Sequence, residues 1–335
     1  MSRWLPPAAL AVLLLALCAL SLALGARAVP LGQVLDALGG AAPDAGVGNV
    51  IWSVRIPRTA VAVLAGAALG VAGALMQALT RNPLADPGLL GVSAGAAFGI
   101  VVAVGVLGVS AVHGYVWFAF AGGLAASVVV YTLGRLGRSG LTPVKLALAG
   151  VAVTALLSSL TSAVVLTSPE TLNRYRFWSA GSLADQSGDG VVRLLPFVVV
   201  GALLALACGP ALNSLALGED VAASLGRRLG LVRLQGVLAI TLLTGAAVAA
   251  IGPVVFLGLV VPHLARMLAQ RAGIGPDQRW LLPMSALLAP CVLLAADVLG
   301  RVLVRPAEIQ AGVLMAFVGG PFFVMMVRRR RLAEL

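Results

Sequence analysis

Long apolar runs, separated by short stretches rich in proline, glycine and arginine, recur along the whole chain. A helix that crosses a bilayer needs about 20 mainly apolar residues, at about 1.5 Å each. The runs that meet or approach this length predict ten membrane-spanning helices: Leu5–Leu24, Thr59–Leu79, Leu89–Val109, Tyr115–Leu133, Lys145–Leu166, Val191–Cys208, Leu234–Ile251, Pro253–Leu268, Leu281–Leu299 and Ile309–Val327. We therefore expect an all-α polytopic membrane protein, with one integral membrane domain over residues 1–335.

The first run has a second interpretation, because Ala26-Arg27-Ala28 resembles a signal-peptide cleavage site. The apolar part of a signal peptide is usually about 7 to 15 residues long, which is shorter than this run. We expect a retained first span.

Composition supports the membrane class. Hydrophobic residues make up 60% of the chain, charged residues 10%, and the mean hydropathy is +1.05, which excludes a water-soluble globular domain. The net charge of +11 raises the question of nucleic acid, but the arginines fall in short clusters between apolar runs. We therefore expect contact with lipid and no nucleic-acid partner. Cys18, Cys208 and Cys291 lie inside apolar segments without metal-ligand or pairing spacing, and we interpret them as packing residues.

Basic residues also predict the orientation. Ten spans place both termini on one side of the membrane, and that side holds 15 of the 23 lysines and arginines. Because basic residues are enriched in cytoplasmic loops, we expect both termini in the cytoplasm.

The stretch RNPLADPGLLGVSAG, between the second and third runs, predicts a helix break. Pro83 disfavours a helical conformation at Asn82, and Asp86 followed by Pro87 is typical of an N-cap and first helical residue. Non-helical backbone cannot face lipid, so it must be buried in protein or border water. On spacing alone, an ordinary loop between helices remains the alternative. Glycines spaced by four predict close helix packing on both sides: Gly66, Gly70, Gly91, Gly95 and Gly99.

Several long motifs together resemble the FecCD-type permeases, the membrane subunits of ABC importers for ferric siderophores, haem and cobalamin. They run from Arg55 to Phe323 in the family's order: RIPRTAVAVLAGAALGVAGALMQALTRNPLADPGLLGVSAGAAFG, LALGEDVAASLG, GPVVFLGLVVPHLAR, DVLGR and PAEIQAGVLMAFVGGPFF. The resemblance implies a cobalamin-permease-like type II ABC importer fold with ten helices per subunit, in the cytoplasmic (inner) membrane. It also implies a homodimer or paired homologous permease, two cytoplasmic ATPase subunits and an extracytoplasmic substrate-binding protein.

The same resemblance assigns a cytoplasmic gate to the loop between the second and third spans. The matching positions are Asn82 and Leu84, and Thr142, before the fifth span, is a looser match. A second interruption follows at Gly252-Pro253, where an unusually short apolar piece ends at Pro262-His263. Paired interruptions of this kind are typical of an inverted repeat.

The stretch LALGEDVAASLGRR predicts a short cytoplasmic helix. Glycines suit its two ends, acidic residues suit its N-terminus, and Val221 and Leu225 share one face. Two turns are marginal alone, so this helix must pack against its own membrane domain or against a partner. The resemblance implies the cleft of an ATPase subunit for the loop 212–230, with these coupling residues: Leu217, Gly218, Glu219, Asp220, Val221, Leu225 and Gly226.

Two features are expected outside the membrane. In SPETLNRYRFWSAG, Ser168 suits an N-cap and Pro169 the first helical position. The residues favour an interfacial helix, and the resemblance implies an extracytoplasmic gate segment over residues 168–190. Arg55, Arg58 and Arg301 match arginines that face glutamates of the binding protein in the family's cobalamin permease. Their planar guanidinium groups suit bidentate contact with carboxylates.

Other chemistry is sparse. The only lysine, Lys145, is not in a phosphate-binding loop, so ATP and Mg must be used by a partner ATPase. No catalytic constellation, metal site or cofactor site is visible, which disfavours an enzyme, and we interpret His113 and His263 as helix-end residues. The acidic residues fall in loops or near span ends, which disfavours the alternative class, an ion-coupled secondary transporter. Ferric siderophore is the preferred cargo because it is the commonest in the family; haem and cobalamin remain alternatives.

Overall fold

The computed structural model describes residues 4–25, 28–40, 45–109, 112–136, 142–184 and 186–331. Within these ranges the chain is helical and contains no strand. The cleavage-like Ala26-Arg27, the loop residues Arg3 and Arg138, and the side chain of His113 lie outside the described part.

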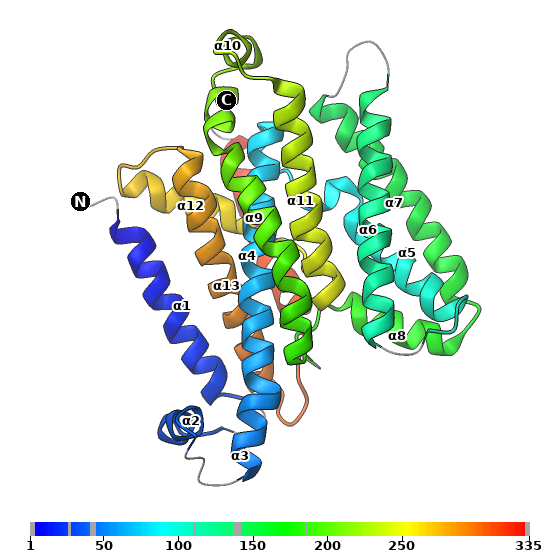
Figure 1. Ribbon diagram of the computed structural model, residues 1–335, viewed down its shortest axis with the longest axis vertical. Coiled ribbons are helices and arrows are strands. Elements are labelled where there is room, and N and C mark those ends of the chain that lie inside the picture. The colour runs from blue at the N-terminus through cyan, green and yellow to red at the C-terminus, as the bar shows by residue number, and fades with distance from the viewer. Residues whose placement is uncertain are drawn as a thin grey trace.

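Every predicted span coincides with a helix (Figure 1). These ten helices are α1 (Leu5–Ala23), α4 (Ile56–Thr80), α5 (Val92–Gly105), α6 (Val112–Arg135), α7 (Pro143–Val165), α9 (Gly188–Ala216), α11 (Leu229–Ile251), α12 (Leu257–Arg271), α13 (Gln278–Leu303) and α14 (Ala311–Arg331). The remaining elements are α2 (Leu31–Leu38), α3 (Ala45–Asn49), the π-helical turn η1 (Val50–Arg55), the 3-10 turn η2 (Pro87–Leu90), α8 (Pro169–Ser179) and α10 (Glu219–Ser224).

Three helices form the centre of the bundle. The most apolar windows of α4, α11 and α13 are 78%, 72% and 72% buried, whereas that of α1 is 11% buried. In Figure 1, α4 stands between α13 and α11, while α5, α6 and α7 form a group on the right. The outer helices therefore present most of their apolar surface away from this chain.

Seven of the described helices are long and apolar enough to cross a membrane. The other three are α5, α12 and α14. Of these, α5 and α12 begin only after the stretches 81–91 and 252–256, which are not α-helical. At about 1.5 Å per residue, α5 is only about 21 Å long.

Parts of both breaks are packed inside the protein. Asp86 is the N-cap of η2, and its Oδ1 accepts a hydrogen bond of 2.7 Å from the Gly88 N–H, as the sequence predicts. Ala85 and Leu90 are 1% and 0% exposed and belong to the main core. A methyl group at Gly258 would touch Pro87, so the start of α12 meets the start of η2. The inner part of this irregular backbone, Ala85 to Gly91, is thus largely packed within the protein, whereas Arg81 and Asn82 are exposed. That the exposed part borders water stays a prediction.

The short apolar piece that ends at Pro262-His263 is the first half of α12, and the helix continues through both residues to Arg271. A proline inside a helix leaves the carbonyl four residues earlier without its usual donor. Here Gln77 Nε2 donates to that carbonyl, Gly258 O, at 3.5 Å and to Leu259 O at 3.2 Å. His263 therefore lies within a helix and not at its end. The centroid of its ring is 6.0 Å from that of Phe322.

The predicted glycine faces are sites of close helix packing. A methyl group at Gly95 would overlap the Gly122 carbonyl of α6, and one at Gly70 would overlap the Ser285 carbonyl of α13. Only hydrogen fits at these two positions, so backbone meets backbone.

The elements between α1 and α4 were not predicted. Val34 and Ala37 of α2 are 2% exposed and pack with Val47 and Ile51 in a small separate core. The spacing of three between Val34 and Ala37 is the helical signal that could have revealed α2.

Candidate functional site

Function-bearing features gather at two opposite ends of the bundle. We call them the α10 end, at the top of Figure 1, and the α2 end, at the bottom. The turn after α4 and the start of α7 share the α10 end, whereas η1 and the end of α13 share the α2 end.

The predicted coupling helix exists as α10, six residues long. Gly218 precedes it with φ +114° and Gly226 follows it with φ +76°, conformations that side chains with a Cβ rarely adopt. Leu217, Val221 and Leu225 are 68%, 42% and 59% exposed. Val221 and Leu225 are four residues apart and share one face of α10, an apolar stripe that this chain leaves uncovered. Leu217 precedes the helix, on the other side of the non-helical Gly218.

The opposite side of α10 contacts the bundle. Ala222 is fully buried, and Glu219 Oε1 lies 2.7 Å from Arg233 Nη2 of α11 and 3.5 Å from Arg81 Nη2 at the end of α4. Asp220 is exposed. The helix therefore has a charged and small inner face and an apolar outer face.

The first two predicted gate residues share one turn. Arg81 ends α4 in a left-handed conformation with φ +50°, and Asn82 Oδ1 then accepts a hydrogen bond of 3.0 Å from the Leu84 N–H. Asn82 is exposed, whereas Leu84 packs against Leu259 and other apolar residues of α12 and α14.

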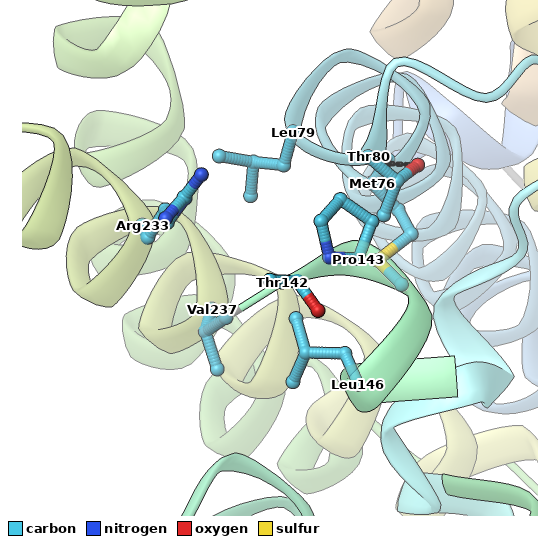
Figure 2. A pocket seen from close by; sticks show the side chains of 8 residues that line it. All are labelled: Met76, Leu79, Thr80, Thr142, Pro143, Leu146, Arg233 and Val237. Atoms are coloured by element: carbon cyan, nitrogen blue, oxygen red, sulfur yellow. Dashed lines mark hydrogen bonds between the residues drawn. The ribbon is translucent and has the colours of Figure 1, made fainter. Parts of the chain in front are cut away.

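Thr142 lies on another side of α4. It is the N-cap of α7, where its Oγ1 accepts a hydrogen bond of 3.3 Å from the Lys145 N–H. It lines a cavity of about 20 Å³ between the ends of α4, α7 and α11 (Figure 2). The other residues around this cavity are Met76, Leu79, Thr80, Pro143, Leu146, Arg233 and Val237.

A polar contact ties the loop 212–230 to α13. Asp277 is the N-cap of α13 and accepts hydrogen bonds from the Arg279 N–H at 2.9 Å and from Asn213 Nδ2 at 2.6 Å. Burial alone would raise the pKa of the Asp277 carboxyl, but these two donors and the Arg279 charge outweigh it and lower the pKa. The carboxylate that holds this contact is therefore ionised at neutral pH.

The α2 end carries the three arginines, and all are buried: Arg55 is 5%, Arg58 8% and Arg301 2% exposed. Arg58 Nη2 lies 2.8 Å from Asp297 Oδ1 and also 2.8 Å from Glu308 Oε2. Arg301 Nη2 lies 2.9 Å from Asp297 Oδ2. We call Arg58, Asp297, Arg301 and Glu308 the α2-end charge network.

Backbone carbonyls at the end of α1 complete the network. Arg301 Nη1 donates to Ser21 O at 3.1 Å and to Leu24 O at 2.9 Å, and Arg55 Nη1 donates to Ala23 O at 2.9 Å. The arginines thus join α1, α4 and α13. Docking of a binding protein on them stays a prediction, and in this conformation their guanidinium groups already have partners within the chain.

Sequence reasoning missed the partners of these arginines. The sequence places Asp297 near a span end, but it is 2% exposed and lies between Arg58 and Arg301. The signal was present in DVLGR, since residues four apart on a helix face the same way. Glu308 had no such local signal, because its partner is distant in sequence.

The segment 168–190 has one internal cap and two hydrogen bonds to the bundle. Ser168 Oγ accepts a hydrogen bond of 3.3 Å from the Thr171 N–H, so the predicted cap of α8 is confirmed. Gly181 O accepts a hydrogen bond of 2.9 Å from the Gly312 N–H at the start of α14. Gln186 Nε2 donates a hydrogen bond of 3.2 Å to Ala250 O at the end of α11. This segment therefore links α11 to α14.

The described residues hold no group of three or more His, Cys, Asp or Glu side chains that could bind a metal ion. The cysteines are free, and Cys208 and Cys291 are buried in the bundle.

Membrane-length helices, buried helix breaks and an uncovered apolar face outside the core define a multi-pass membrane transport protein. The family model described as the FecCD transport family matches residues 13–329, and the chain belongs to this family.

The chain is 47% identical over 322 residues to the ferric enterobactin transport system permease protein FepD of Escherichia coli (strain K12), covering 96% of this chain and 94% of that protein. It is 40% identical to the hemin transport system permease protein HmuU of Yersinia pestis, covering 84% of each. A solved structure described as an inward-facing conformation of a metal-chelate type ABC transporter shares 28% identity with a TM-score of 0.84, over 96% of this chain and 98% of that one. The chain is thus a permease subunit of an ABC importer, a translocation component and not an enzyme.

Proposed function

We propose that this chain carries a ferric siderophore inward across the cytoplasmic (inner) membrane, as a homodimer or beside a paired homologous permease. The observation that supports this cargo best is the 47% identity to a ferric enterobactin permease over 96% of the chain. Haem is the second candidate, supported by the 40% identity to a hemin permease.

Uptake of labelled candidates tests the cargo. The permease would be reconstituted with its ATPase and binding protein, and ferric enterobactin, haem and cobalamin would be offered separately. The proposal expects ATP-dependent accumulation of the ferric siderophore and little of the other two. Accumulation of haem alone would transfer the function to the second candidate.

In this proposal the α10 end faces the cytoplasm, together with both termini. The apolar stripe of Val221 and Leu225, together with the exposed Leu217 that precedes α10, enters a cleft of an ATPase subunit, and two such subunits use ATP and Mg. An uncovered apolar stripe outside the core supports this role, because exposed apolar patches mark protein interaction sites. Residues 1–335 act as one domain, in which the loop 212–230 is the coupling segment.

Asn82, Leu84 and Thr142 contribute to the cytoplasmic gate. Support comes from their common position at the α10 end, in a turn with non-helical backbone and at a helix N-cap. Residues 168–190 shape the extracytoplasmic gate, and their hydrogen bonds to α11 and α14 support a link between that segment and the bundle.

The substrate-binding protein docks at the α2 end through Arg55, Arg58 and Arg301. Of the network carboxylates, Glu308 is the more accessible, since its side chain is 33% exposed while that of Asp297 is 2% exposed. Glu308 therefore occupies Arg58 until a carboxylate of the binding protein replaces it. Asp297 stays in place and keeps the helices together.

We expect Glu308→Gln to increase the affinity for the loaded binding protein severalfold, because it frees Arg58 from a competing carboxylate. Surface plasmon resonance at low and high salt would measure this gain, and a misfolded variant could not produce it. Asp36→Asn, which removes an exposed carboxylate from α2, is the matched control. Equal affinity of both variants and the parent would argue against docking on Arg58.

A further inference from the structure

Glu219 lies on the inner face of α10. It is two residues before Val221, which is about 200° around a helix, so it lies opposite the apolar stripe. Its carboxylate is shared by two guanidinium groups, 2.7 Å from Arg233 Nη2 and 3.5 Å from Arg81 Nη2.

Each of these arginines adjoins a different part of the inner mouth. Arg81 is the left-handed residue that ends α4 and directly precedes Asn82. Arg233 belongs to α11 and lines the cavity that Thr142 also lines, where its side chain points toward Leu79 of α4 (Figure 2). One carboxylate on α10 thus reaches both the turn that carries Asn82 and Leu84 and the cavity beside Thr142.

The short helix cannot hold its position by itself, because six residues are fewer than an independent helix needs. Its inner face rests on the bundle through Ala222 and Glu219, and its outer face is the uncovered stripe. A force applied to the stripe therefore moves Glu219 relative to Arg81 and Arg233.

We propose that Glu219 is a positioning residue that transmits displacement of α10 to the turn Arg81–Leu84 and to the Thr142 cavity. The proposal rests on the function proposed above, in which an ATPase moves α10. It adds which side chain carries that motion to the gate.

The test follows the exposure of the gate turn directly and needs no knowledge of the cargo. Cys18, Cys208 and Cys291 are replaced by Ala, Asn82→Cys is introduced, and the complete permease–ATPase complex is reconstituted. The rate of maleimide labelling at position 82 is then compared between the nucleotide-free complex and the complex trapped with ATP and vanadate.

With Glu219 present, we expect the labelling rate to differ about fivefold or more between the two states, the lower end of typical coupling between sites. With Glu219→Gln, the difference should fall below about twofold in complexes that are shown to contain bound ATPase. Asp36→Asn is the matched control and should leave the difference unchanged. A difference undiminished by Glu219→Gln would overturn the proposal, and so would loss of ATPase assembly, which would make Glu219 a docking residue.

A double-mutant cycle supplies a second readout. Because Glu219 and Arg233 act through one contact, Glu219→Gln with Arg233→Gln should reduce the labelling difference no further than either change alone. Independent, multiplying losses would contradict the link. Failure of the parent complex to bind any ATPase would count against the proposed function itself, and normal assembly with unlinked residues would count only against this inference.

Discussion

Asp297 is the carboxylate that pairs with two buried arginines at the α2 end. Its two oxygens face two arginines, at 2.8 Å and 2.9 Å, in a site where all three side chains are nearly inaccessible. Buried charges are tolerated in protein only when they are paired and hydrogen-bonded. The network is therefore a joint between α1, α4 and α13, and docking would have to act through its exposed edge.

We expect Asp297→Asn to destabilise the permease by about 3–5 kcal/mol. The change removes the buried counter-charge of Arg301 and leaves Arg58 only Glu308. The midpoint of thermal unfolding of the purified protein in detergent measures this loss. Asp36→Asn removes the same charge from an exposed position and should leave the midpoint unchanged. Equal midpoints for the two variants would mean that the network contributes no stability.

Gln77 offers a second test at this scale, since it replaces the hydrogen bond that Pro262 cannot donate. Gln77→Leu keeps a similar volume but leaves the Gly258 and Leu259 carbonyls without this donor, and Arg266 without the Gln77 acceptor. We expect a loss of about 1–3 kcal/mol, since each unsatisfied buried group carries a desolvation penalty. Gln270→Leu, at an exposed position of α12, is the control, and an equal effect there would remove the special role of Gln77.

Among the elements, α10 has two faces with different contacts. Its inner face is fixed by a buried alanine and a shared carboxylate, and its outer face is apolar and uncovered. Gly218 and Gly226 set its two ends through positive φ angles. Such a helix can transmit a displacement only if a partner binds its outer face.

We expect Val221→Asp with Leu225→Asp to abolish binding of the ATPase subunit, because docking would bury two unpaired carboxylates. Co-purification with the ATPase measures the effect, and the conservative pair Val221→Leu with Leu225→Met should bind normally. The monomeric fold should survive, since both positions are exposed in this chain. Normal co-purification of the doubly charged variant would show that the stripe is not the docking face.

At the same scale, the sequence predicted most of the helices and both ends of the break after α4. Apolar length reveals a span, and Asp86-Pro87 reveals a cap, because both signals are local. The contacts of Gln77 with the Gly258 and Leu259 carbonyls beside Pro262 could not be foreseen, since Gln77 lies on another helix. The network at Arg58 was hidden for the same reason: Asp297 is 239 residues away in sequence. Contacts between segments that are distant in sequence produce no periodic pattern of residues from which they could be predicted.

For the whole molecule, the two ends have different chemistry. The α2 end is closed by buried charges, the α10 end presents the apolar stripe and the exposed Asn82, and two helix breaks meet between them. An importer needs this polarity, because it must recognise its loaded partner on one side and receive mechanical work on the other. A carrier driven by an ion gradient would need no uncovered face for an ATPase.

The most direct test is therefore uptake of radio-iron-labelled ferric siderophore by proteoliposomes that contain the permease, its ATPase and its binding protein. Accumulation should require ATP and Mg on the α10 side and loaded binding protein on the α2 side. It should also persist when proton and sodium gradients are collapsed. Accumulation driven by an ion gradient without ATP would contradict the importer and favour a secondary transporter.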